Sequence, residues 1–532
     1  MSDTIETLDL INNQLPKIHV KCIEFNDGTK YELTPGSIVI FTGANNSGKS
    51  QVLRDIESYI KDPTVPTVIV KDVELEYSGV LDFKYFKSKA RLSDDGYYWF
   101  GGSRDFYEGW KNKWENRNLY FLASLFVNRL DTEERLIASK AKPLYSGNLS
   151  ETINPMQKLH FSNSIEDEIS KLFYEGFGQD LIVNRRFGSN VSLHIGKRPE
   201  WPGGREGEGL YYEAVGNMPM IDKQGDGIRS FTSILIDTFT SDTSITLIDE
   251  PEAFLHPPQA RIIGRILAKN NPNQRQLFIA THSSDFINGL LEGNNQNVVI
   301  IRINRNDNIN HMYSLDNIKI HKLWKNPILR YSNILNGLFH KKVIVCESDY
   351  DCLFYKAMID EVYEDSPETV LDIMFTHSGG KDRMKDIVSA LKALRVSVIA
   401  IPDFDILNDK RKLIQLTASY GIKEEINSKL DAIYGYLNAN NGKIRDLIKD
   451  NGYSILKGAA YNKYQELDQL FRSYGLFIVP VGEIECFDKS ITSNKKDWVY
   501  SVIERGDLGN HEQLEDARNF VKKIVSYTEK FD

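Results

Sequence analysis

A short turn rich in small residues constrains the fold of this chain more than any other segment. Its sequence, GANNSGKS at 43–50, fits the pattern G-x-x-x-x-G-K-[ST] and lies between the apolar run SIVIFT and the helix-like run QVLRDIESYIK. A turn in this position is what a phosphate loop requires, because its N–H groups and the helix N-terminus attract phosphate. We therefore predict an α/β domain that binds ATP through residues of this loop, namely Gly43, Asn46, Ser47, Gly48, Lys49 and Ser50.

Two carboxylates end a second apolar run, ITLIDE at 245–250. Ligands bind at the carboxyl edge of an open α/β sheet, so charged residues at this point of a buried strand indicate a site. We expect Lys49 to reach the β- and γ-phosphates, while Ser50 and Asp249 hold Mg²⁺. Glu250 is expected to polarise the attacking water. Each residue alone is consistent with an ordinary strand end, but the ordered set predicts ATP hydrolysis.

The order of elements predicts two α/β domains. Alternation in 17–42 indicates two antiparallel strands followed by a buried strand, and strands alternate with helices in 225–303. A second alternating run begins after Lys342, which indicates another parallel sheet. We place an ATPase domain at 1–330 and a second domain with a C-terminal helical extension at 331–532.

Residues 62–220 are irregular and rich in aromatic side chains, which indicates a subdomain inserted into the ATPase domain. A long apolar helix is expected within it at 120–136. The aromatic and basic stretch at 97–117 is typical of the core and rim of a small subdomain, although such side chains also stack on bases.

Carboxylates also cluster at three strand ends of the second half. Like charges held close together cost stability, and hard divalent ions such as Mg²⁺ or Mn²⁺ relieve that cost through oxygen ligands. Two such ions support phosphodiester hydrolysis. A helix that began directly after VIVCE would place two of these carboxylates, four residues apart, on one face. The candidate ligands are Glu347, Asp351, Asp403, Asp405, Glu485 and Glu483, and for the last an ordinary solvated strand end is an equal alternative.

The first set of motifs resembles that of the ABC ATPase superfamily, in the branch that SMC-like and OLD-like proteins share. The resemblance implies that Asp249 and Glu250 are the Walker B pair and that 251–256 form the D-loop. It also implies that His282 is the switch histidine facing the γ-phosphate. The signature motif is placed at QGDGIR, although its usual leading serine is absent. Because the signature loop of one ABC subunit closes over the ATP of another, the resemblance implies at least a homodimer whose nucleotide contacts include Gly225, Gly227 and Arg229.

The second set, a glutamate followed by Asp-x-Asp, resembles a TOPRIM domain. Joined behind an ABC ATPase, it resembles the OLD family of nucleases, which includes the Gabija nuclease and nuclease effectors of some retrons. The resemblance covers about 18–60, 220–305 and 340–490. It implies that the carboxylates are metal ligands and that Lys381 holds a phosphate or the scissile strand. Lys495 or Lys496 is the candidate for stabilising transition-state charge, and a solvated surface side chain is the alternative for these lysines and for Lys381. One departure from the pattern is Ser348, where the family usually has glycine.

Composition narrows the class of protein without identifying a partner. The net charge of −9 argues against a uniformly basic DNA-binding surface but not against a local basic channel. The four cysteines form no CxxC pair, which argues against a zinc site or a disulfide framework. With no apolar run long enough for a membrane span and no secretory leader, we expect a cytoplasmic protein that does not enter membranes.

The favoured hypothesis is an ATP-hydrolysing, Mg²⁺- or Mn²⁺-dependent DNA endonuclease controlled by nucleotide. It would act as a homodimer or higher oligomer in defence against phage, alongside a partner such as a reverse transcriptase with its RNA or DNA, or a helicase. The alternative is a non-cleaving, SMC-like ATP-dependent DNA scaffold. The sequence leaves open the DNA substrate, nicking against double-strand cleavage, and whether ATP activates or restrains cutting.

Overall fold

The computed structural model describes residues 15–92, 96–100, 103–105, 107–143, 155–200, 205, 209–272, 275–306, 309–315, 333–422, 426–439 and 443–529. The chain divides into two compact units, residues 1–317 and 318–532. The predicted boundary at 330/331 lies outside the described residues, so the predicted domain limits stay a prediction.

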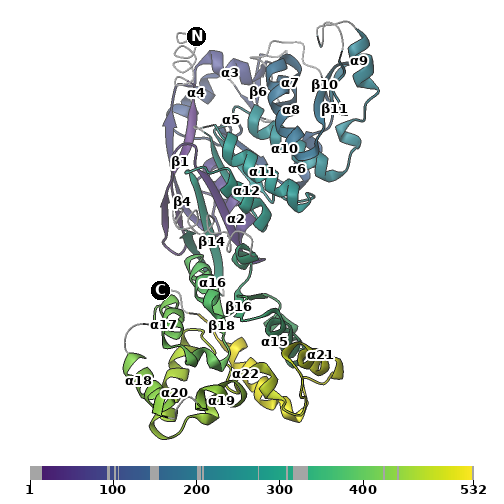
Figure 1. The fold of residues 1–532 in the computed structure, drawn as a ribbon. Coiled ribbons are helices and arrows are strands. Elements are labelled where there is room, and N and C mark those ends of the chain that lie inside the picture. The colour runs from purple at the N-terminus through teal and green to yellow at the C-terminus, as the bar shows by residue number, and fades with distance from the viewer. Residues whose placement is uncertain are drawn as a thin grey trace. The chain divides into compact units, whose positions relative to one another are not determined.

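The N-terminal unit contains a mostly parallel sheet with the strand order β15-β14-β3-β13-β12-β8 (Figure 1). The three central strands are buried at every position, as expected for near-continuous apolar runs in a parallel sheet. Only β15 runs antiparallel to its neighbour. The strands are β3 (Ile38–Gly43), β8 (Val127–Leu130), β12 (Ile245–Asp249), β13 (Gln276–Ala280), β14 (Val298–Asn306) and β15 (Ile309–Leu315).

A second sheet of this unit, β2-β1-β4, is antiparallel throughout. It confirms the two antiparallel strands expected before the phosphate loop. Apolar residues of β1, β3 and the helix after the loop belong to one buried cluster, so the two sheets share a core around that helix. The elements are β1 (Lys17–Phe25), β2 (Lys30–Glu32), β4 (Val70–Ser78) and α2 (Lys49–Lys61).

The segment at 62–220 contributes to both sheets, through β4 and β8. The long helix expected at 120–136 is wrong, because α5 (Ala123–Phe126), β8 and α6 (Thr132–Ala138) occupy that stretch. Short apolar runs fit a strand as well as a helix, and here pairing with β12 decides for the strand. Within the aromatic stretch Trp110 is fully buried, which supports the interpretation of a subdomain core.

The remaining elements of the N-terminal unit are helices and two small antiparallel sheets, β5-β6-β7 and β10-β11-β9. They are α3 (Phe83–Lys89), β5 (Arg91–Leu92), β6 (Tyr98–Phe100), β7 (Ser103–Asp105), α4 (Tyr107–Glu115), β9 (Lys142–Pro143), α7 (Pro155–Phe161), α8 (Asn163–Phe177), β10 (Asp180–Phe187), β11 (Asn190–Gly196), α9 (Gly209–Gly216), η3 (Ile221–Lys223), α10 (Asp226–Thr240), α11 (Pro257–Asn270) and α12 (Ser284–Glu292).

The C-terminal unit is built on a parallel sheet in the order β17-β16-β18. The expected third carboxylate-bearing strand, LFIVPV, is an extended segment beside β18, held by backbone bonds such as Phe477 N to Ala400 O (2.9 Å) and Val479 N to Pro402 O (3.0 Å). Cys346 at the end of β16 lies opposite Ile401 at the end of β18, so the residues that follow these two strands meet at one edge. The strands are β16 (Lys342–Cys346), β17 (Ile373–His377) and β18 (Ser397–Ile401).

Helices surround this sheet in two groups, α17 to α20 on one side and α15, α21 and α22 on the other (Figure 1). Among the described helices, none combines the length and apolar character that a bilayer crossing needs. The described helical elements of the unit are η4 (Asn333–Phe339), α15 (Asp349–Val362), η5 (Pro367–Thr369), α16 (Lys381–Ala393), η6 (Phe404–Asn408), α17 (Lys410–Ser419), α18 (Asn427–Ala439), α19 (Lys443–Asn451), η8 (Gly452–Ile455), α20 (Gly458–Ser473), η9 (Ile484–Phe487), α21 (Lys495–Arg505), η10 (Glu512–Leu514) and α22 (Glu515–Ser526).

Candidate active sites

The phosphate loop connects β3 to α2 with a positive φ at three residues, Gly43 (148°), Asn46 (60°) and Gly48 (99°). Glycine is also required at Gly43, where a Cβ would lie 2.3 Å from the carbonyl oxygen of Ile303. Lys49 is largely buried, and its Nζ donates to the carbonyl oxygens of Gly43 (3.0 Å) and Ala44 (2.9 Å). The Lys49 side chain is therefore held against the phosphate loop by these two hydrogen bonds.

The two expected Mg²⁺ ligands of the ATP site lie together. Ser50 Oγ donates to Asp249 Oδ1 over 2.9 Å, although 199 positions separate these residues in the chain. Burial raises the pKa of Asp249, and the bond from Ser50 opposes that rise. A hydroxyl and a carboxylate in contact beside a phosphate loop fit a Mg²⁺ site with oxygen ligands.

Glu250 follows β12 with a positive φ of 48°, which is uncommon for a residue with a side chain. Nδ1 of His282 lies 3.3 Å from a carboxylate oxygen of Glu250 and 3.3 Å from one of Glu252. The hydrogen bond between Glu250 and His282 lowers the pKa of the carboxyl and raises the pKa of the imidazole. The expected base and switch histidine are thus in contact.

Glu252 is a residue of this site that the sequence analysis missed. It is buried, and it accepts hydrogen bonds from Thr281 Oγ1 (2.8 Å) and from the backbone N–H of His282 (2.9 Å). It therefore fixes the loop that carries the histidine. The only sequence signal was its place in the PEAFLH segment after Glu250.

Arg135 was also missed, because it lies in the stretch 120–136, where the sequence predicted a helix but no site residue. Its side chain is fully buried and its guanidinium donates to Asp249 O (2.6 Å), Glu250 O (2.8 Å) and Ser230 Oγ (3.1 Å). Burial lowers the pKa of Arg135, and nearby carboxylates oppose that shift. One side chain on α6 thereby connects the end of β12 to α10.

The predicted signature residues lie at the start of α10, which has Gly225 as its N-cap. A Cβ at Gly227 would lie 2.7 Å from the carbonyl oxygen of Phe254, so a small residue is needed where α10 meets the segment 251–256 of the same chain. Arg229 pairs with Asp226 (2.8 Å) and donates to Leu136 O. These contacts are internal, and the action of the motif across a subunit interface stays a prediction.

Carboxylates of the C-terminal unit meet at the carboxyl ends of β16 and β18. Oxygen atoms of Glu347, Asp403 and Asp405 all lie within 4.8 Å of one another. Asp403 and Asp405 are buried, and the backbone N–H of Asp403 donates to Glu347 Oε1 over 3.0 Å. Burial raises the pKa of Glu347 to about 7 and holds that of Asp403 well above its usual range. This geometry and chemistry fit hard divalent cations.

Three lysines from three different helices contact this carboxylate group. Lys381, at the start of α16, pairs with Asp405. Lys495, at the start of α21, places Nζ 2.9 Å from Asp351 Oδ1 and 3.1 Å from Asp403 Oδ2. Burial alone would lower the pKa of Lys495, but the charges of Asp403 and Asp351 outweigh it and raise the pKa.

The third lysine, Lys449 on α19, was not anticipated from the sequence. Its Nζ lies 3.0 Å from Glu483 Oε1 and 3.6 Å from Asp405 Oδ2. No strand end or glycine-rich turn marks its position in the sequence.

The other predicted carboxylates have different surroundings. The expectation of one helical face for Glu347 and Asp351 is wrong, because α15 begins only at Asp349 with Ser348 as its N-cap. Asp351 instead forms a capping box, accepting from the Ser348 N–H and hydroxyl, both at 2.9 Å. Glu485 has a buried Oε2 that lacks a hydrogen-bond partner among the described residues, and burial raises its pKa. Such an oxygen is consistent with a ligand.

Comparison with known proteins gives two family matches. Residues 76–288 match a family described as "AAA domain, putative AbiEii toxin, Type IV TA system", and residues 338–405 match "Overcoming lysogenization defect protein-like, TOPRIM domain". The Old nuclease of Escherichia phage P2 is 22% identical over 256 residues, which are 46% of this chain and 43% of that protein. The chain thus spans less than half the length of this relative.

Solved structures similar to this chain include SMC heads. An Smc head domain from Pyrococcus furiosus bound to the C-terminal domain of ScpA is 14% identical and covers 58% of this chain and 99% of its own (TM-score 0.36). The SMC head domain from Thermotoga maritima is 11% identical, and the match covers 57% of this chain and 99% of that domain (TM-score 0.29). The family matches confirm the predicted α/β fold class, an ATPase domain followed by a TOPRIM domain, and the resemblance to OLD-family nucleases.

Proposed function

We propose that this protein is an ATP-hydrolysing, divalent-metal-dependent DNA endonuclease whose cleavage is controlled by nucleotide. The observation that carries the proposal is the meeting of Glu347, Asp403 and Asp405 within 4.8 Å, surrounded by lysines. A module that only binds DNA gains nothing from such repulsion, because like charges in a buried group destabilise the fold. This argument favours cleavage over the SMC-like scaffold.

The carboxylates would hold Mg²⁺ or Mn²⁺, with Glu347, Asp403 and Asp405 as the inner group and Asp351, Glu483 and Glu485 as neighbours. Cations at this position supply an activated water and charge stabilisation for phosphodiester hydrolysis. The Asp403 N–H fixes the Glu347 carboxylate, which keeps the ligand oxygens in place. Lys381 and Lys495, which contact Asp405 and Asp403, would also bring positive charge to a scissile phosphate.

At the ATP site, Lys49 would exchange its loop carbonyls for phosphate oxygens while Ser50 and Asp249 hold Mg²⁺. Glu250, in contact with His282, would orient the attacking water. Gly225, Gly227 and Arg229 would complete the ATP site of a second copy, so the working form is a homodimer or larger. Mixing Lys49→Ala protein with Arg229→Ala protein should restore one composite site per heterodimer. No recovery of ATPase activity in verified heterodimers would contradict the shared site.

The experiment that tests the nuclease proposal separates the two sites. Asp403→Ala should abolish Mg²⁺- or Mn²⁺-dependent plasmid cleavage while leaving ATP hydrolysis nearly intact, since the carboxylates lie in the other unit. Asp360→Ala is the matched control, because that carboxylate is exposed and, among the residues that the structure describes, forms an ion pair with Lys356 alone, one turn away. Cleavage by Asp403→Ala at the rate of the control would refute the proposal.

Defence against phage is the cellular role that fits a nucleotide-controlled nuclease of this family, in the cytoplasm and with a partner such as a reverse transcriptase or a helicase. Plaque assays on cells carrying the wild-type gene region and the Asp403→Ala variant test this role. Equal protection by both would show that cleavage is not the protective activity.

A further inference from the structure

Two exposed tyrosines and a lysine form a small surface on η8 and the start of α20. We call Tyr453, Lys457 and Tyr461 the tyrosine surface. The tyrosines are 36% and 37% exposed, and their ring centroids lie 6.2 Å apart. Lys457 is exposed and forms no ion pair with the residues that the structure describes. The chain from Asn451 to Gln465 contains no carboxylate, in a protein whose net charge is −9.

The tyrosine surface is connected to the carboxylate group through contacts between aromatic rings. Buried Tyr464 lies beneath Tyr453, with nearly parallel rings (14°) and centroids 6.3 Å apart. The Tyr464 ring contacts Phe404 edge to face at 5.1 Å. Phe404 stands between Asp403 and Asp405 in the chain, so two ring contacts separate the surface from the proposed metal ligands.

Backbone contacts hold the same region rigidly to the site. The N–H of Tyr453 donates to Pro480 O over 3.0 Å, and that of Glu483 donates to Lys449 O over 3.0 Å. Gly452 has a φ of 54°, and a Cβ there would lie 1.9 Å from Pro480 O. The tyrosines are therefore presented on a fixed support, which limits the ordering cost of binding a ligand.

We propose that the tyrosine surface binds an unpaired base of the nucleic-acid strand whose phosphate enters the carboxylate site. This inference rests on the proposed nuclease function and adds a substrate class, DNA with unpaired nucleotides beside the cleaved bond. Exposed tyrosine rings stack on any base, and stacking needs a base face that a duplex hides. Lys457 supplies a positive charge for the backbone of the same strand.

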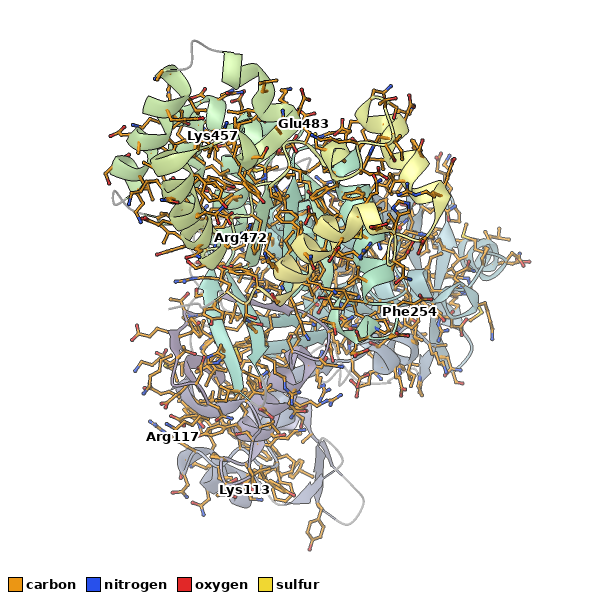
Figure 2. The ribbon with its side chains drawn as sticks, turned by 90° about the horizontal axis from the view of Figure 1, so that it is seen from below. Lys113, Arg117, Phe254, Lys457, Arg472 and Glu483 are labelled. Atoms are coloured by element: carbon orange, nitrogen blue, oxygen red, sulfur yellow. The ribbon has the colours of Figure 1, made fainter. Side chains whose placement is uncertain are left out.

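The control residue comes from the other end of the same helix. Tyr474, the C-cap of α20, is 39% exposed and so matches the two tyrosines in type and exposure. Lys457 and Arg472 mark the two ends of this helix in Figure 2. A helix of this length spans about 24 Å, so Tyr474 is beyond the reach of a base bound at the tyrosine surface.

The test measures how tightly the protein binds a DNA hairpin in buffer that contains Ca²⁺. The hairpin has a single-stranded overhang, and this overhang carries the fluorescent base 2-aminopurine. With wild-type protein the fluorescence should be quenched at one overhang position, and the fully paired duplex should bind more weakly. Tyr453→Ala and Tyr461→Ala should weaken binding about tenfold or more and remove the quenching. Tyr453→Phe and Tyr474→Ala should behave like wild type, and ATP hydrolysis should persist in every variant.

Equal binding by Tyr453→Ala, Tyr461→Ala and wild type would overturn the inference, as would equal binding of paired and overhanging DNA. A loss in Tyr453→Phe would also overturn it, because the hydroxyl and not the ring would then carry binding. A loss of DNA binding in Tyr474→Ala would overturn it as well, because a tyrosine outside the tyrosine surface would then have the same effect. If wild type neither binds nor cuts any DNA, the nuclease proposal itself fails, which is a different result.

Discussion

Replacing Glu347 with glutamine should stabilise the protein in the absence of metal while destroying its nuclease activity. In the wild type, Glu347 Oε1 accepts a hydrogen bond from the backbone N–H of Asp403 over 3.0 Å. Glutamine keeps the size of the side chain and an oxygen that can accept the same bond. It removes one charge from a group of three carboxylates within 4.8 Å. The substitution therefore isolates the electrostatic cost of the site from its packing.

The magnitude follows from the pKa of Glu347, which burial raises from 4.5 to about 7. Between these values the folded protein keeps a proton that the unfolded chain has released, so the free energy of unfolding falls as the pH rises through this window. The loss is on the order of 3 kcal/mol and is complete above pH 7. Below pH 4.5 the wild type and Glu347→Gln should be equally stable.

Hydrogen exchange of β16 and β18 in EDTA measures this difference, at pH 5 and pH 8 after correction for intrinsic exchange rates. At pH 8 both strands should exchange more slowly in Glu347→Gln, and Glu364→Gln, an exposed control, should match wild type. Saturating Mg²⁺ should slow exchange in wild type by more than in the variant, since ligand bound only to the fold stabilises it. A variant less stable than wild type at pH 8 in EDTA would refute the reasoning.

Two further predictions concern the ATP site. Lys49→Ala should lose ATP binding, whereas Glu250→Gln should bind ATP and hydrolyse it roughly 100-fold or more slowly, because a general base is lost; filter binding and phosphate release distinguish these results, and wild-type hydrolysis by Glu250→Gln would contradict the assignment. Arg135→Met should lower the free energy of unfolding by about 2 to 6 kcal/mol, since the buried carbonyl oxygens of Asp249 and Glu250 each lose the guanidinium donor at about 1 to 3 kcal/mol apiece. Urea denaturation measures the Arg135 effect, and a loss below about 1 kcal/mol would contradict it.

Much of both candidate sites could be predicted because parallel strands bring their carboxyl ends to one edge. Asp249 and Ser50 are distant in sequence, yet each follows a recognisable pattern next to a buried strand, and they lie in contact. Glu347 and Asp403 follow strands that pair from Lys342 to Cys346, so their meeting follows from the register. The local sequence around such residues is therefore enough to predict where they lie.

The residues that could not be predicted are placed by packing of distant elements. Arg135 depends on β8, a strand of four residues whose sequence fits a helix equally well until β12 pairs with it. Lys449 approaches Asp405 only because α19 packs beside η6 and the segment at 480–483. Nothing in the few residues around either side chain determines these contacts.

One physical argument applies to the lysines of both sites, and it links the binding of cations to the binding of an anionic ligand. Lys49 contacts backbone oxygens of its loop, and Lys381 and Lys495 contact carboxylates, so each ammonium already has an oxygen partner. A cation bound among Asp403 and Asp405 competes for the same carboxylate charge and weakens their attraction for the lysines. The lysines then gain most by meeting an anion, and a phosphodiester is the anion that this site is proposed to take. Cations and DNA should therefore strengthen each other's binding, because each removes a cost that the other faces.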